Sequence, residues 1–117
     1  MASYQDLMVW QRGMDLAEEV YRLSRIMPKT EEYRLVGQLL RAVVSVPANI
    51  AEGHARKTRK DYANFIGIAK GSLAETETLL LLAVRVKLLH EQAAGTALQL
   101  TDELGRMLNV LGQRLST

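Results

Sequence analysis

The sequence predicts an all-α protein folded as an antiparallel, up-and-down four-helix bundle. Apolar residues recur at spacings of three and four in four successive segments, and short polar turns separate these segments. No run of alternating or β-branched residues indicates a strand or hairpin. A length of 117 residues, 48% of them hydrophobic, suits a single core. We therefore expect one domain over residues 1–117, with helices at about 6–27, 31–52, 58–89 and 92–115.

The first predicted helix, about 6–27, has an unusually wide apolar face. One stripe consists of Leu7, Trp10, Met14, Ala17, Tyr21 and Ser24, and a second of Leu16, Val20, Leu23 and Met27. We expect Asp6 to cap the helix and Pro28 to end it, because a residue before proline disfavours the helical conformation. Two stripes predict contacts with more than two neighbouring helices.

The second predicted helix, about 31–52, contains a proline. Its apolar positions are Val36, Leu39, Val43, Val46 and Ile50. Pro47 removes one backbone hydrogen bond and crowds the preceding turn, which predicts a kink or local opening between Val43 and Pro47. Gly53 is expected to end the helix in the left-handed conformation.

The third and fourth predicted helices complete the bundle. Thr58 is expected to cap the third, with Asp61 in its first turn, and Gly71 and Ser72 would allow another helix to approach closely. Leu79, Leu81 and Leu82 lie outside its main apolar stripe. These residues and the double stripe of the first helix predict exposed apolar patches, and hence self-association.

We find no pattern typical of a catalytic, cofactor or metal site. The sequence has no cysteine and no Glu-x-x-His pair of the kind that binds metals in bundles, and both histidines, His54 and His90, fall at predicted helix ends. Neither a glycine-flanked nucleophile nor a phosphate-binding loop occurs. We expect a protein that is not an enzyme and holds no cofactor.

Four polar residues lie close to the apolar stripes of the second and third helices: Arg41, Asn49, Glu52 and Glu75. Pointing inward, they would form either a ligand pocket with paired carboxylates or a structural polar network. We favour the network, in which Arg41 pairs with a carboxylate and the backbone freed by Pro47 is satisfied, because buried charges must be paired in either case.

A short basic segment precedes and begins the third helix. Arg56, Lys57, Arg59 and Lys60 occur there without an acid, although the net charge of the chain is only +2. The segment is a solvated connection, a site for phosphate or nucleic acid near a helix N-terminus, or a surface for salt bridges between subunits. Few aromatic residues are available to stack bases, so any nucleic-acid binding would be mostly electrostatic.

The sequence also indicates where the protein resides. The N-terminal residues lack the basic and apolar regions of a signal peptide, and the longest apolar run, residues 79–84, is far shorter than a membrane span. The absence of cysteine fits a reducing compartment. We expect a soluble cytoplasmic protein with no membrane partner.

Three segments resemble the bacterial four-helix bundle proteins first noticed in intervening sequences of large-subunit ribosomal RNA genes. They are DLMVWQ (6–11), QLLRAVVSVPANIAEG (38–53) and ANFIGIAKGSLAETET (63–78). The positions that carry this resemblance are Arg41, Ser45, Pro47, Asn49, Ile50, Ala51, Glu52 and Gly53, together with Gly71, Ser72, Leu73 and Glu75.

The resemblance implies a bundle that assembles into a ring-like homopentamer. A related branch of the family serves diversity-generating retroelements as a basic pentamer that binds nucleic acid and a reverse transcriptase. We therefore expect a non-enzymatic homo-oligomeric scaffold or adaptor, which binds copies of itself and a protein or nucleic-acid partner. The alternative is a nucleic-acid-binding accessory protein that uses residues 56–60.

Overall fold

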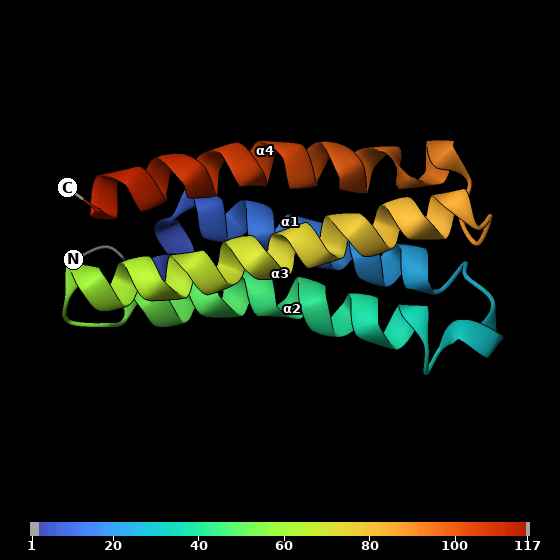
Figure 1. Cartoon of the computed structure of the whole chain (residues 1–117), viewed down its shortest axis with the longest axis horizontal. Helices are drawn as coiled ribbons and strands as arrows, with labels where there is room; N and C mark the ends of the chain where they lie inside the picture. The colour runs from blue at the N-terminus through green and yellow to red at the C-terminus, as the bar shows by residue number, and fades with distance from the viewer. Residues whose placement is uncertain (1–2, 117) are drawn as a thin grey trace.

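Four antiparallel helices pack side by side in an elongated bundle of 43 × 22 × 20 Å (Figure 1). The computed structural model describes residues 3–116, so residues 1–2 and 117 of the predicted domain lie outside the described part. The main helices are α1 (Met8–Ser24), α2 (Leu35–His54), α3 (Arg59–Arg85) and α4 (Glu91–Leu115). Two short 3-10 helices, η1 (Tyr4–Asp6) and η2 (Lys29–Glu31), precede α1 and α2. Within residues 3–116 there is no strand, and the predicted all-α fold with four helices is confirmed.

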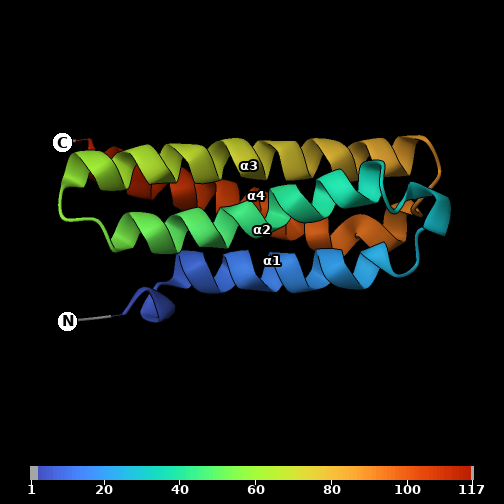
Figure 2. The same ribbon diagram turned by 90° about the horizontal axis from the view of Figure 1, so that it is seen from below.

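The order of the helices around the bundle follows their order in the chain. Each helix packs against the next and α4 packs against α1, whereas among the described residues no Cα atoms of the diagonal pairs come within 8 Å of each other. Both chain ends and the α2–α3 connection lie at one end of the bundle (Figure 1). Seen from below, α2 lies between α1 and α3 (Figure 2). The bundle therefore has four lateral faces, each formed by two neighbouring helices.

The first two helices begin later than the sequence predicted. Asp6 does not cap α1; instead Ser3 and Asp6 form a capping box on η1, and Leu7 precedes α1 in an extended conformation. The second helix begins at Leu35 rather than near residue 31, because Arg34 has a non-helical backbone (φ −113°, ψ −112°). Local capping and backbone geometry, which apolar spacing does not record, set both starts.

The predicted roles of Gly53 and Thr58 have opposite outcomes. Thr58 caps α3 as predicted, since its hydroxyl accepts a hydrogen bond from the Asp61 backbone N–H at 3.0 Å. Gly53 is not a left-handed stop: it lies inside α2, and none of the described glycines has a positive φ. A Cβ at Gly53 would lie 2.9 Å from the Cβ of Phe65, so this glycine instead allows α3 to approach closely.

Among the described residues, only Lys87 has a positive φ, and it lies two residues after the end of α3. The predicted end near residue 89 is wrong, because the helix stops at Arg85 and Lys87 takes φ = 67°. The Leu88 N–H then donates to the Ala83 carbonyl at 2.8 Å, as in a Schellman motif. A lysine occupies the position that usually favours glycine.

Pro47 interrupts α2 less than we expected. The helix is continuous from Leu35 to His54, without the predicted local opening. The proline ring is buried against α1, where a Cβ on Gly13 would lie 3.3 Å from the Pro47 Cβ. A glycine in the facing helix thus provides the space that the proline ring needs.

Burial in the core confirms most of the predicted apolar stripes. In α1, however, the stripe identified second, not the one identified first, is the buried one. It consists of Leu16, Val20, Leu23 and, just beyond the helix, Met27. Met14 and Tyr21, from the stripe identified first, are 45% and 43% exposed. In α3, Leu81 and Leu82 are exposed as predicted, but Leu79 is buried, at 8% exposure. None of the helices within the described residues is long and apolar enough to cross a membrane.

Candidate interaction site

The basic segment lies at the end of the bundle that also holds both chain ends. Arg56 donates to the Glu52 carboxylate at 2.8 Å, and its guanidinium lies 4.7 Å from the centre of the Phe65 ring. Arg59 donates to the backbone carbonyl of Arg114 in α4. Lys57 and Lys60 are exposed and form no ion pair with any described residue. Contacts within the protein therefore hold two of the four cations, and two lysines extend into solvent.

The polar residues of α2 and α3 do not meet as the sequence suggested. Arg41, Glu52 and Glu75 are all exposed, and only Asn49 is partly buried. The Arg41 guanidinium folds back along α2, where its Nη1 would lie 3.6 Å from a Cβ on Gly37. Neither the inward ligand pocket nor the predicted pairing of Arg41 with a carboxylate is present within residues 3–116. Long charged side chains can turn outward from the edge of an apolar stripe and remain hydrated.

A smaller set of polar contacts, mostly between neutral side chains, does join α2 to α3. The Asn49 side-chain amide donates to the carbonyl and hydroxyl oxygens of Ser45 at 2.7 and 2.8 Å. Ser72 in α3 donates its hydroxyl to the Ser45 hydroxyl at 2.8 Å, and Glu75 accepts from the amide of Gln38 at 3.2 Å. Each buried polar side-chain atom of the described residues has a partner. These contacts are structural and include Ser45 and Ser72 but not Arg41.

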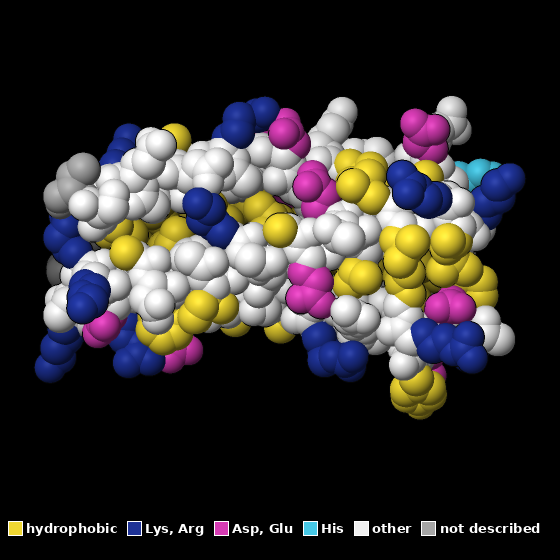
Figure 3. Space-filling model, viewed as in Figure 1, with side chains coloured by type: hydrophobic (Ala, Val, Ile, Leu, Met, Phe, Trp, Pro, Cys, Tyr) yellow, Lys and Arg dark blue, Asp and Glu magenta, His cyan; other side chains and the backbone are white. Residues whose placement is uncertain are grey.

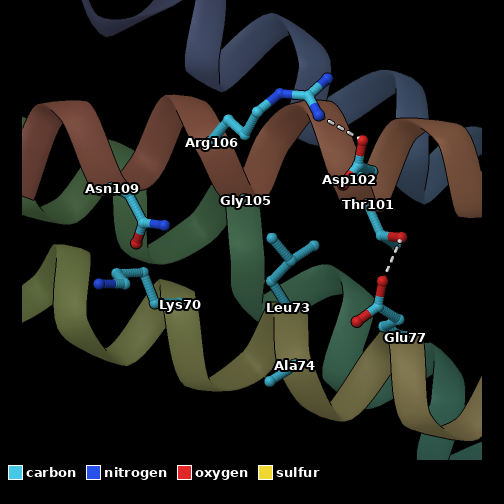
Figure 4. A pocket seen from close by; sticks show the side chains of 9 residues that line it. All are labelled: Lys70, Leu73, Ala74, Glu77, Thr101, Asp102, Gly105, Arg106 and Asn109. Atoms are coloured by element: carbon cyan, nitrogen blue, oxygen red, sulfur yellow. Dashed lines mark hydrogen bonds and ion pairs between the residues drawn. The ribbon is translucent and has the colours of Figure 1, made fainter.

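A shallow groove of about 320 Å³ lies between α3 and α4 (Figure 4). Lys70 and Asn109 extend toward each other across it, from α3 and α4 respectively. Farther along, Arg106 pairs with Asp102 at 2.5 Å, and the Thr101 hydroxyl donates to Glu77 at 3.2 Å. The space-filling view shows this hollow with an apolar floor (Figure 3).

The groove continues toward the end of the bundle with the basic segment. A second hollow of about 310 Å³ shares Lys70 and Asn109 with the first. Its other lining residues are Ala63, Ile66, Gly67, Gly112, Gln113 and Ser116, and none of them is acidic. Sequence reasoning missed this groove. The available signal was the set of glycines in α3 and α4, since a Cβ at Gly67, Gly71 or Gly112 would have no neighbour within 4 Å. For Gly71 this also contradicts the predicted close helix approach.

The remaining candidate groups lie apart from one another. His54, the last residue of α2, contacts the Tyr62 ring edge-on with centroids 5.9 Å apart, and burial raises the pKa of the Tyr62 phenol. His90 precedes α4 at the opposite end of the bundle. Nowhere in the described part of the chain do three His, Cys, Asp or Glu side chains gather as a metal site would require.

The fold and these surfaces define a small four-helix protein in which none of the described Asp, Glu, Lys or Arg side chains is buried. The chain matches the family of the 23S rRNA-intervening sequence protein over residues 5–110, and it belongs to that family. The resemblance inferred from the three sequence segments is therefore confirmed.

A solved structure supports the fold independently. A protein of unknown function from Bacteroides thetaiotaomicron VPI-5482, described as a member of the S23 ribosomal protein family, superposes with a TM-score of 0.80. The two sequences are 24% identical, and the alignment covers 86% of this chain and 94% of the other. None of the curated proteins matches the sequence.

Proposed function

We propose that this protein is a cytoplasmic, non-enzymatic scaffold that assembles with copies of itself. The observation that carries the proposal is the grouping of exposed apolar side chains. Leu81, Leu82 and Val86, all 42–53% exposed, lie near the end of α3, and Figure 3 shows apolar side chains gathered at that end of the bundle. Met14 and Val44 are similarly exposed on α1 and α2. Exposed groups of apolar side chains usually mark an interface.

The copy number is part of the proposal. The family resemblance implies a ring of five, and head-to-tail contacts between identical subunits close into rings when the rotation between neighbours allows it. A bundle with apolar side chains on more than one helix has the two different surfaces that such a contact requires. Protein partners would then bind the outer surface of the assembled ring.

The test is a mass measurement on the purified protein. Light scattering coupled to size exclusion, over a range of micromolar concentrations, is expected to give a single species of about five times the 13.1 kDa chain mass. A closed assembly of another size would correct the copy number. A stable monomer throughout the range would contradict the scaffold proposal.

Nucleic-acid binding is the second candidate, and the groove between α3 and α4 favours it. The half of the groove without acidic residues runs toward the basic segment, where Lys57 and Lys60 are exposed without ion pairs to described residues. Lys70 adds a cation in the groove itself. Clustered cations beside a groove suit a phosphate chain without sequence specificity.

Neutralising cations tests this candidate. Changing Lys57 and Lys60 to alanine avoids the structural contacts of Arg56 and Arg59. The variant is expected to bind single-stranded RNA or DNA more weakly and to lower the dependence of affinity on salt by roughly 1.5 in log–log slope. The matched control changes Arg25 and Lys29, exposed at the opposite end, to alanine. Absence of binding by the unmodified protein at low salt would contradict the candidate.

A further inference from the structure

The face formed by α1 and α2 is free of charge over most of its length. On the α1 side, successive spacings of four and three that begin at Trp10, three residues before Gly13, give one set of positions. They are Trp10, Met14, Ala17, Tyr21 and Ser24. On the α2 side the corresponding positions are Gly37, Leu40, Val44, Ala48 and Ala51. The two helices lie side by side in Figure 2, so these positions form one continuous surface.

Two oppositely charged residues without an ion pair border the middle of this face, whereas Arg25 and the paired Glu52 border it nearer its two ends. Glu18 in α1 and Arg41 in α2 are exposed, and neither forms an ion pair with another described residue. They also lie at about the same height along the bundle. Glu18 follows Gly13 by five residues and Arg41 precedes Pro47 by six, which corresponds to roughly 7.5 and 9 Å toward the same end.

The equal positions of Glu18 and Arg41 along the bundle matter because rotation about a ring axis parallel to the bundle does not change them. In any ring whose axis runs along the bundle, α1 of one copy placed against α2 of the next brings Glu18 opposite the neighbour's Arg41. The same contact covers apolar positions on both helices. A second copy of the chain therefore supplies both an apolar surface and the opposite charge for Glu18 and for Arg41. Together, apolar contact and charge pairing fix how two copies align at an interface.

We propose that the α1–α2 face is the contact between copies of this chain, with Glu18 of one copy paired to Arg41 of the next. This inference rests on the proposed self-assembly and adds its surface and register. The apolar positions supply most of the association free energy, and the charge pair selects the alignment of neighbouring copies.

Charge reversal and its rescue test the inference. Glu18→Arg or Arg41→Glu alone brings like charges together, so the assembly is expected to dissociate at concentrations about tenfold higher or more, as measured by sedimentation velocity. The double variant E18R/R41E restores opposite charges and the original net charge, and it is expected to assemble like the unmodified protein. Lys70→Glu, on the α3–α4 face, makes the same charge change as Arg41→Glu and is expected to leave assembly unaltered.

The outcomes separate this inference from the scaffold proposal. If the unmodified protein assembles but neither single reversal weakens it, the α1–α2 contact is wrong while self-assembly stands. A double variant that remains dissociated while it retains helical circular dichroism and thermal stability also overturns the pairing, as does equal weakening by Lys70→Glu. A monomeric unmodified protein removes both proposals at once.

Discussion

Two opposite faces of this bundle use glycine in opposite ways. On the α1–α2 face, Gly13 lies directly against Pro47, and the helices meet without a charged residue along the seam. On the α3–α4 face, Gly67 and Gly112 border open space, and Lys70, Asn109 and paired charges line the groove. A small residue in a helix therefore allows close packing only when a neighbouring helix fills the space above it. Otherwise it creates a groove.

The largest expected effect is on self-association, and it comes from placing a charge on the α1–α2 face. Ala48→Glu places a carboxylate on the charge-free face, and burying it without a partner is expected to weaken self-association about a hundredfold. Ala74→Glu makes the same change at an exposed position of the groove, and assembly is expected to persist. Sedimentation velocity measures both variants, and equal behaviour of the two would remove the functional difference between the faces.

A medium effect on stability is expected from enlarging the glycines. Gly13→Leu forces a side chain against the Pro47 ring, and overpacking is expected to lower the free energy of unfolding by about 1–3 kcal/mol. Gly67→Leu adds the same side chain above open space and is expected to leave stability unchanged or higher. Urea denaturation followed by circular dichroism compares them. A loss in the Gly67 variant as large as that in the Gly13 variant would contradict the distinction.

The smallest expected effect is an increase in stability. Gly67→Ala is expected to raise the free energy of unfolding by about 0.5–1 kcal/mol, because alanine loses less conformational entropy in a helix interior and meets no neighbour there. Thermal unfolding of this variant beside the parent protein measures the shift. A decrease in stability would mean that the groove is filled in solution.

Helical period and capping chemistry were sufficient to predict four helices, the buried stripe of α2 and the Thr58 cap. The same patterns could not decide which of two α1 stripes faces the core, because that depends on where α2 and α4 lie. Gly53 illustrates a second limit. A glycine near a helix end suits both a left-handed stop and a close contact, and only the position of Phe65 decides between them.

The candidate site was predicted less well than the fold. The basic segment was found because charge clustering is visible in sequence, although the engagement of Arg56 and Arg59 within the protein was not. Arg41 was expected inside because it adjoins an apolar stripe, but a flexible stem lets its guanidinium turn outward. The α3–α4 groove arises from open space between helices, which no single residue type encodes.

The position of the single tryptophan gives the bundle a built-in optical reporter. Trp10 lies partly buried on the α1–α2 face, with its ring centre 5.4 Å from that of Tyr4 in an edge-on arrangement. Its emission therefore arises from the surface assigned to the contact between copies. Dilution that separates the copies would hydrate the indole and shift its fluorescence to longer wavelength, so unlabelled protein can report its own assembly.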